Sequence, residues 1–71
     1  MDKKIYIKGM SCQHCVNRVK NALEALDGVD EAIVNLEGNV ARVSMKENIA
    51  DSIINEAIED AGYAVIRIET I

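Results

Sequence analysis

The sequence predicts an α+β fold of the βαββαβ type, in which a four-stranded antiparallel sheet is covered on one face by two helices. Three short segments alternate apolar and polar residues as strands do, a fourth is rich in Val and Ile without clean alternation, and two longer segments repeat apolar residues at helical spacing. Turn residues, chiefly glycine and asparagine, separate most of them. Because the 71 residues contain no linker or internal repeat, we expect residues 1–71 to form a single domain.

The first predicted strand covers residues 4–8 and turns Ile5 and Ile7 toward the core. A helix is predicted over residues 13–26, and Gly28 supplies the stop. Its apolar positions recur at helical spacing, opposite a polar face. They are Val16, Val19, Ala22, Leu23 and Leu26.

Two further strands are predicted to pair as a hairpin, over residues 31–36 and 40–45. Residues 37–39 between them read Glu-Gly-Asn, which favours a turn. The alternation within each strand predicts which side chains face inward. They are Val34, Leu36, Ala41, Val43 and Met45.

The second helix is predicted to begin with Asn48 as its cap, to carry Asp51 in its first turn and to end at Gly62. Its outer face is acidic. Its inner face is predicted to be an apolar stripe. The stripe is Ala50, Ile53, Ile54, Ala57, Ile58 and Ala61.

The last strand is predicted over residues 64–69, but its inward face stays open because Val65, Ile66 and Ile68 do not alternate. If the first and last strands are antiparallel neighbours, the end of the first lies beside the start of the last. This topology predicts that Tyr63 lies next to the loop that follows the first strand.

Composition argues against several classes of function. A net charge of −4, a pI near 4.8 and only 3% aromatic residues argue against a nucleic-acid surface. No apolar run approaches the roughly 18 residues of a membrane span, and no apolar leader follows residues 1–4. We therefore expect no membrane insertion and a cytoplasmic location, where thiols stay reduced.

Both cysteines and the only histidine lie within residues 9–15, Gly-Met-Ser-Cys-Gln-His-Cys, where the first strand pattern gives way to the first helix. Thiolates are soft ligands, and two residues between Cys12 and Cys15 allow both sulfurs to reach one ion. If Ser11 caps the helix, Cys15 lies in its first turn, where free amides and the helix dipole favour the ionised thiol. The motif therefore predicts a metal site.

Copper(I) is the favoured ion, because structural zinc and iron–sulfur clusters call for more protein ligands than two cysteines, whereas Cu(I) accepts two or three thiolates. Thiol–disulfide exchange is a rival interpretation of a lone CxxC pair. The chain has no proline or tryptophan to support it. A third interpretation, buried cysteines acting as small hydrophobes, conflicts with the polar character of the loop.

The motif at residues 9–15 resembles that of heavy-metal-associated domains, and the sequence looks most like the bacterial CopZ-like copper chaperones. The likeness spans the chain and includes residues 28–29, 34–36 and 57–63. It implies a ferredoxin-like fold and Cu(I) held by Cys12 and Cys15. It also implies delivery of the ion to a similar domain of a copper-transporting P-type ATPase. Relatives that select zinc or cadmium often have an aspartate at the position of Ser11, so the serine favours copper as the bound metal.

Five neighbouring residues are expected to support the cysteine pair: Gly9, Met10, Ser11, His14 and Tyr63. The Met10 thioether is a potential ligand, but the resemblance implies that this residue packs beneath the loop. The imidazole of His14 suits copper, but a residue between two ligating cysteines tends to point away from their ion. We therefore expect His14 to face solvent, where it either modulates the acidity of the thiolates or supplies an extra ligand when two molecules meet. The resemblance favours a supporting role for Tyr63 beside the sulfurs over simple closure of the core.

Partner docking is expected around the loop, through Gln13, Arg18 and Lys20. The two cations either meet an acidic partner or are ordinary solvated charges. The expected partner is the metal-binding domain of a copper ATPase, and a copper-responsive repressor is a second candidate. We expect the protein to be a monomer without copper and to form a copper-bridged homodimer at high loading.

Three functions follow from these observations. The first is a copper carrier, the second a metal-binding domain of a larger copper ATPase, and the third a thiol–disulfide oxidoreductase. A methionine just before the first strand and no linker after the last favour the free-standing carrier. We therefore expect a carrier and not an enzyme.

Overall fold

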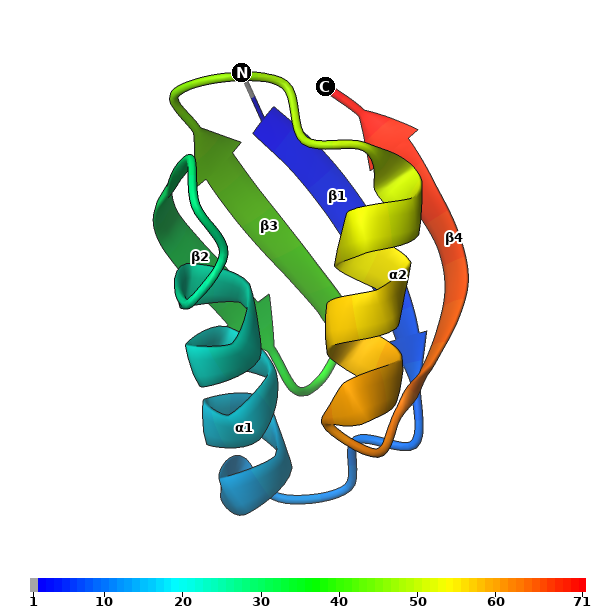
Figure 1. Cartoon of the computed structure of the whole chain (residues 1–71). Coiled ribbons are helices and arrows are strands. Elements are labelled where there is room, and N and C mark those ends of the chain that lie inside the picture. The colour runs from blue at the N-terminus through cyan, green and yellow to red at the C-terminus, as the bar shows by residue number, and fades with distance from the viewer. Residues whose placement is uncertain (1) are drawn as a thin grey trace.

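The computed structural model describes residues 2–71 and has the βαββαβ order that the sequence predicts (Figure 1). The sheet order is β2-β3-β1-β4, and every neighbouring pair is antiparallel. Both helices lie on one face of the sheet, which confirms the ferredoxin-like fold. The elements are β1 (Asp2–Lys8), α1 (Gln13–Glu24), β2 (Val29–Asn35), β3 (Val40–Met45), α2 (Asp51–Asp60) and β4 (Ala64–Thr70).

Helix α1 ends at Glu24, two residues before the predicted end. Leu26 still packs against the core, but its amide bonds the carbonyl of Leu23, three residues back, so the chain has already left the α-helical pattern. Gly28 then takes a φ of +95° and turns the chain into β2, which begins at Val29. The extra apolar residue made the helix look longer than it is.

The predicted cap of α2 is wrong: Ala50, not Asn48, precedes the helix, and no side chain caps it. Ile49 is 6% exposed, and its burial fixes the chain just before the helix. Lys3 of β1, itself only 5% exposed, donates to the Ile49 carbonyl at 2.7 Å and to Asp51 Oδ1 at 2.6 Å. A buried cation therefore ties the start of α2 to β1, a contact that no local pattern predicts.

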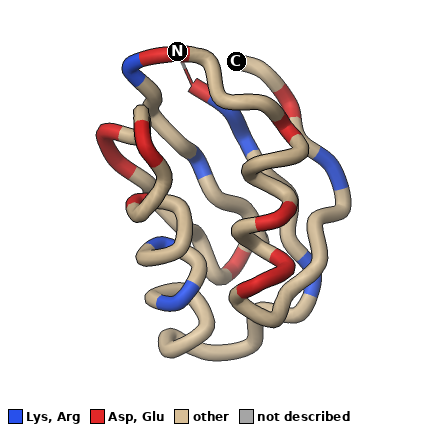
Figure 2. Tube along the Cα trace, viewed as in Figure 1, with Lys and Arg blue, Asp and Glu red and all other residues tan. Residues whose placement is uncertain are grey.

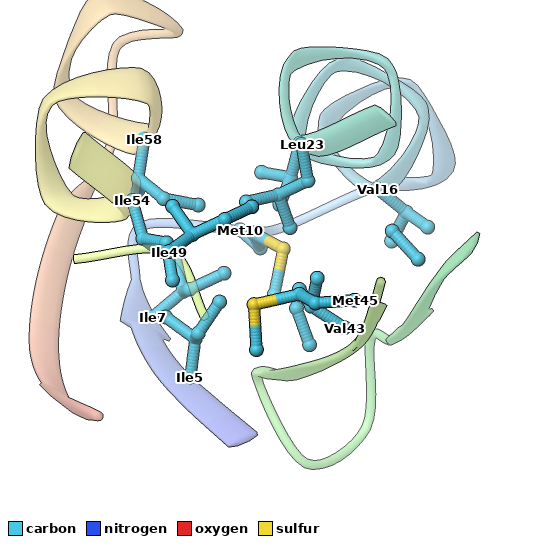
Figure 3. Close-up of a cluster of buried hydrophobic side chains, with 13 residues drawn as sticks. Ile5, Ile7, Met10, Val16, Leu23, Val43, Met45, Ile49, Ile54 and Ile58 are labelled. Carbon is cyan, nitrogen blue, oxygen red and sulfur yellow. The ribbon is translucent and has the colours of Figure 1, made fainter. Parts of the chain in front are cut away.

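An aliphatic cluster fills the space between the helices and the sheet (Figure 3). The inward positions predicted for β1 and β3 are confirmed, and Val34 and Leu36 lie half-buried at its edge. On α2 the prediction is wrong for Ala50, which is exposed, and for Ile53, which is 47% exposed. The cluster comprises Ile5, Ile7, Met10, Val16, Val19, Leu23, Ala32, Ala41, Val43, Met45, Ile49, Ile54 and Ile58.

A bulge in β4 explains why its apolar residues do not alternate. Tyr6 pairs with Arg67, whereas the next residue of β1, Ile7, pairs with Val65. Ile66 is thus the extra residue of the bulge, and its side chain is 64% exposed, whereas Val65 and Ile68 are half-buried and pack against the core.

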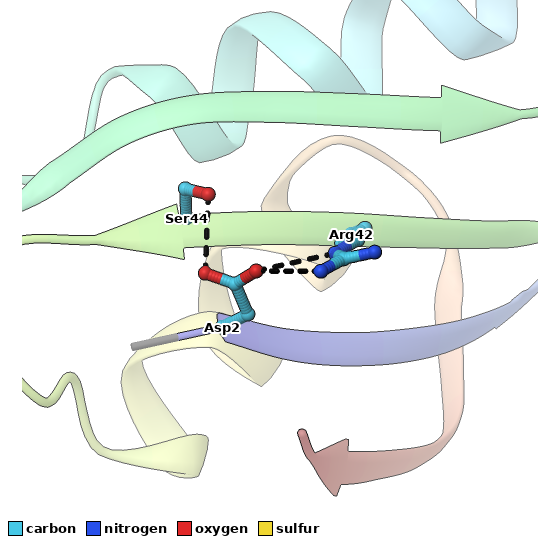
Figure 4. A network of polar contacts seen from close by, with 3 residues as sticks. All are labelled: Asp2, Arg42 and Ser44. Atoms are coloured by element: carbon cyan, nitrogen blue, oxygen red, sulfur yellow. Dashed lines mark hydrogen bonds and ion pairs between the residues drawn. The ribbon is translucent and has the colours of Figure 1, made fainter.

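A polar network on the open face of the sheet joins the start of β1 to β3 (Figure 4). Arg42 Nη2 donates to Asp2 Oδ2 at 2.8 Å, and the Ser44 hydroxyl donates to Oδ1 at 3.1 Å. The Arg42 hydrogen bond is the main reason that the pKa of Asp2 lies below its ordinary value. Within residues 2–71, neither helix is both long enough and apolar enough to cross a bilayer.

Candidate metal site

The cysteines lie at the end of the molecule where β1 passes into α1 (Figure 1). Gly9 turns the chain there with a φ of +105°, a backbone conformation that side chains disfavour. Met10 then points into the core and is 6% exposed, which confirms its predicted burial, while Ser11 and Cys12 are exposed. The turn therefore holds Met10 in the core and leaves Ser11 and Cys12 open to solvent.

The two sulfurs lie 3.5 Å apart, close enough for one ion to contact both. Cys12 is the residue that precedes α1, and the Cys15 amide bonds its carbonyl at 3.1 Å, so Cys15 lies in the first turn as predicted. The prediction that Ser11 caps the helix is wrong, since the cap position belongs to Cys12 and no side chain caps it. The free amides of this turn are thus left for the sulfurs.

Hydrogen bonds lower the pKa of the Cys15 thiol to about 6. The largest contribution comes from the backbone amide of Ser11, followed by the Tyr63 hydroxyl and the side chain of Cys12, while desolvation opposes the shift. Cys15 is therefore a thiolate at neutral pH, ready to bind a soft cation. Ser11 was predicted to support the site through a hydroxyl that caps the helix, but it does so through its backbone amide, which lowers the pKa of Cys15.

Tyr63 lies beside the loop, as the strand topology predicts. Helix α2 ends at Asp60, and Gly62 two residues later takes a φ of +97°. The Tyr63 amide donates to the Ile58 carbonyl at 3.2 Å, so the chain turns toward the sulfurs. A Cβ added at Gly9 would lie 3.5 Å from Tyr63 Cδ1, so the ring packs against the turn. The hydrogen bond to Cys15 is also the main cause that raises the pKa of Tyr63.

The side chains predicted to face solvent or a partner are exposed: Gln13, His14, Arg18 and Lys20. Gln13 reaches only Asn17, through a long side-chain hydrogen bond of 3.4 Å. Nowhere in residues 2–71 do three or more His, Cys, Asp or Glu side chains gather around a common point, so the histidine does not join the cysteines. The donor set is two sulfurs, one half-buried and one exposed, which suits a two-coordinate soft ion better than tetrahedral zinc.

Comparison with known families agrees with this geometry. The model of the heavy-metal-associated domain matches residues 4–64, and the chain belongs to this family.

Relatives and solved structures extend the match over nearly the whole chain. The copper chaperone CopZ of Staphylococcus haemolyticus is 47% identical over 66 residues, which cover 92% of this chain and 97% of the relative. A solved CopZ metallochaperone is 40% identical with a TM-score of 0.87, covering 93% of this chain and all of that one. A copper-binding domain from HMA7, a P-type ATPase, is 36% identical with a TM-score of 0.84, covering 99% and 100%.

Proposed function

We propose that this protein is a copper chaperone that holds Cu(I) between the sulfurs of Cys12 and Cys15. One observation carries the proposal: two sulfurs 3.5 Å apart on an exposed loop, one of them ionised at neutral pH, without a third donor among the described residues. The resemblance to proteins named copper chaperones supports copper as the cargo. The exchange takes place in the cytoplasm, whose reducing conditions keep the thiols unpaired.

The ion leaves by ligand exchange within a complex. An exposed two-coordinate ion leaves room for an incoming thiolate of the partner, which forms a third copper–sulfur bond before the bond to Cys12 breaks. A second partner thiolate then replaces Cys15, so one thiolate leaves for each that arrives and no electron is transferred. Cys12 is the more exposed of the two sulfurs and is released first.

The recipient is the metal-binding domain of a copper-transporting P-type ATPase, and a copper-responsive repressor is a second recipient of the same kind. The ATPase domain that this chain resembles supports the first choice, since two similar sites exchange an ion with little net driving force. Arg18 and Lys20 steer an acidic partner toward the loop, and steering of this kind weakens as salt rises. Without a recipient, two copies share copper across the loop as a homodimer.

Anaerobic titration with Cu(I) tests the binding site. We expect one Cu(I) per chain at low loading, and a loss of affinity of more than about tenfold in the Cys12→Ser and Cys15→Ser variants. Ser52→Ala, on the outside of α2, is the control and leaves affinity unchanged. Undiminished binding in both cysteine variants would refute the site, and equal retention of zinc in a competition would mean that it has a further ligand.

Stopped-flow transfer to a purified ATPase metal-binding domain tests delivery. We expect transfer faster than spontaneous copper loss and independent of the concentration of a Cu(I) chelator. Lys20→Glu slows transfer and weakens its salt dependence, whereas Lys46→Glu, at the opposite end of the sheet, has the same charge change and little effect. A transfer rate equal to the rate of copper loss contradicts delivery by contact.

The same geometry fits a second function, that of a metal-binding domain within a copper ATPase. The similarity to the HMA7 domain favours it. The two functions differ in the direction of exchange, because a carrier loads such a domain while the domain receives. A neighbouring gene for a separate copper ATPase favours the carrier, and an ATPase continuing in the same reading frame favours the domain.

A further inference from the structure

Helices α1 and α2 lie side by side (Figure 1), and two adjoining hollows are lined by residues of both helices and of the segments at one end of them. One hollow of about 370 Å³ is lined by Ala22, Leu26, Ile53, Glu56, Ala57 and Asp60. A second, of about 510 Å³, shares Leu26 and Ile53 and adds Asp27 and residues 47–50. We call the two together the interhelix groove. It extends along the helices to the end of the molecule opposite the cysteines.

The floor of the interhelix groove includes an exposed isoleucine that is not required for the packing of α2 on the sheet. Ile53 is 47% exposed although Ile54 and Ile58 already supply the buried side of α2. Leu26 is only half-buried beside it. An isoleucine next to a partly open leucine offers an anchor for an apolar side chain of another molecule.

The rim carries four carboxylates, Asp27, Glu47, Glu56 and Asp60, and none of the described residues that line either hollow is a cation. Among residues 2–71, no hydrogen bond or ion pair of the structure involves any of these four side chains. In Figure 2, α2 carries several acidic segments and no basic one. The rim is therefore unneutralised charge around an apolar floor.

One of the rim carboxylates is also unfavourable for the helix that carries it. Asp60 lies in the last turn of α2, which contains no basic residue, so its charge adds to the negative end of the helix dipole. Local stability therefore does not account for an acid at this position. A cation from outside the chain would neutralise it.

We propose that the interhelix groove binds a cationic amphipathic helix of a partner protein. Apolar residues of that helix cover Ile53 and Leu26, while its Lys or Arg residues meet the four rim carboxylates. A second copy of this chain does not fit, because the exposed side of its α1 carries Arg18 and Lys20 but no apolar residue to cover Ile53, and its α2 is acidic. An anionic membrane surface is repelled by the rim. The groove does not include the cysteines, so it can be filled while the metal loop is engaged elsewhere.

Binding of a synthetic amphipathic Leu/Lys peptide of about 14 residues, roughly four helical turns, tests the proposal. We expect amide shifts of the isotope-labelled protein to gather on residues 22–27 and 47–60. The Glu47→Gln/Glu56→Gln variant should bind the peptide about tenfold more weakly, since two cation contacts are lost. The control Glu31→Gln/Glu37→Gln, with the same charge change on exposed residues outside the groove, should bind within about twofold.

Two further variants separate binding in the groove from a general loss of charge and from the copper site. Ile53→Ser should weaken peptide binding without lowering copper affinity. The Cys12→Ser/Cys15→Ser variant should keep full peptide binding, so the outcome is independent of the proposed copper function. Equal weakening in the Glu31→Gln/Glu37→Gln control, or shifts gathered on the open face of the sheet, would overturn the proposal. So would self-association of the copper-free protein that Ile53→Ser abolishes, or binding of the protein to phosphatidylglycerol vesicles through the groove.

Discussion

Substitution of Met10 distinguishes a packing role for its side chain from direct ligation of copper at the proposed site. Its side chain is 6% exposed and belongs to the core cluster (Figure 3). Met10→Ala removes Cγ, Sδ and Cε, worth about 2.4 kcal/mol at about 0.8 kcal/mol per methylene-sized group. A cavity that does not close raises the cost to about 3 kcal/mol. A chain of 71 residues has a total stability of roughly 4–10 kcal/mol, so this loss is large.

Met10→Leu keeps the volume and removes the sulfur, and it is the matched control. We expect it to cost less than about 1.5 kcal/mol in urea unfolding. Its Cu(I) affinity, measured against a chromophoric chelator, should stay within about twofold of the original. A drop of more than about tenfold in Met10→Leu, with stability preserved, would show that the thioether binds copper and would refute the packing role.

Three more predictions concern residues around the loop and the helix ends. Tyr63→Phe raises the pKa of Cys15 above about 6, because a hydrogen bond to the thiolate is lost. The pKa is measured from thiolate absorbance near 240 nm as a function of pH, with Cys15→Ser as the blank. Because folding lowers the pKa of Cys15, the ionised thiol stabilises the fold above its unfolded pKa, and this contribution disappears as pH falls through about 6. The Cu(I) affinity should fall over the same pH range, and an affinity that does not change with pH would contradict thiolate ligation. Gly62→Ala costs about 1–2 kcal/mol in urea unfolding from its positive φ alone, because a Cβ there meets no atom within 4 Å; no loss would mean that the turn relaxes freely.

Periodicity predicted the fold because each element buries one face against one shared core. Ile5 and Ile7 at alternate positions, and Val16, Val19 and Leu23 at helical spacing, all lie where the pattern places them. The pattern failed where a tertiary contact or an irregularity replaced a local rule. Ile66 is the inserted residue of a bulge, and the start of α2 is fixed by Ile49 and the buried Lys3 instead of by a capping side chain.

Part of the candidate site was predictable for a different reason. The spacing of Cys12 and Cys15 brings their sulfurs together wherever a helix begins, and strand topology alone brings Tyr63 beside them. The Ser11 amide was missed, because side-chain patterns carry no information about which backbone group faces the sulfur. Its signal was the position of the loop before a helix start, where amides have no partner within the helix.

X-ray absorption at the copper edge of the protein loaded with one Cu(I) per chain tests ligation by Cys12 and Cys15 most directly, because it reports the atoms bound to the ion. A site made by these two residues predicts two sulfur ligands and no nitrogen or oxygen ligand, with the signal lost in the Cys12→Ser/Cys15→Ser variant. A nitrogen ligand that disappears in His14→Ala, or a third sulfur that disappears in Met10→Leu, would contradict a site made by Cys12 and Cys15 alone.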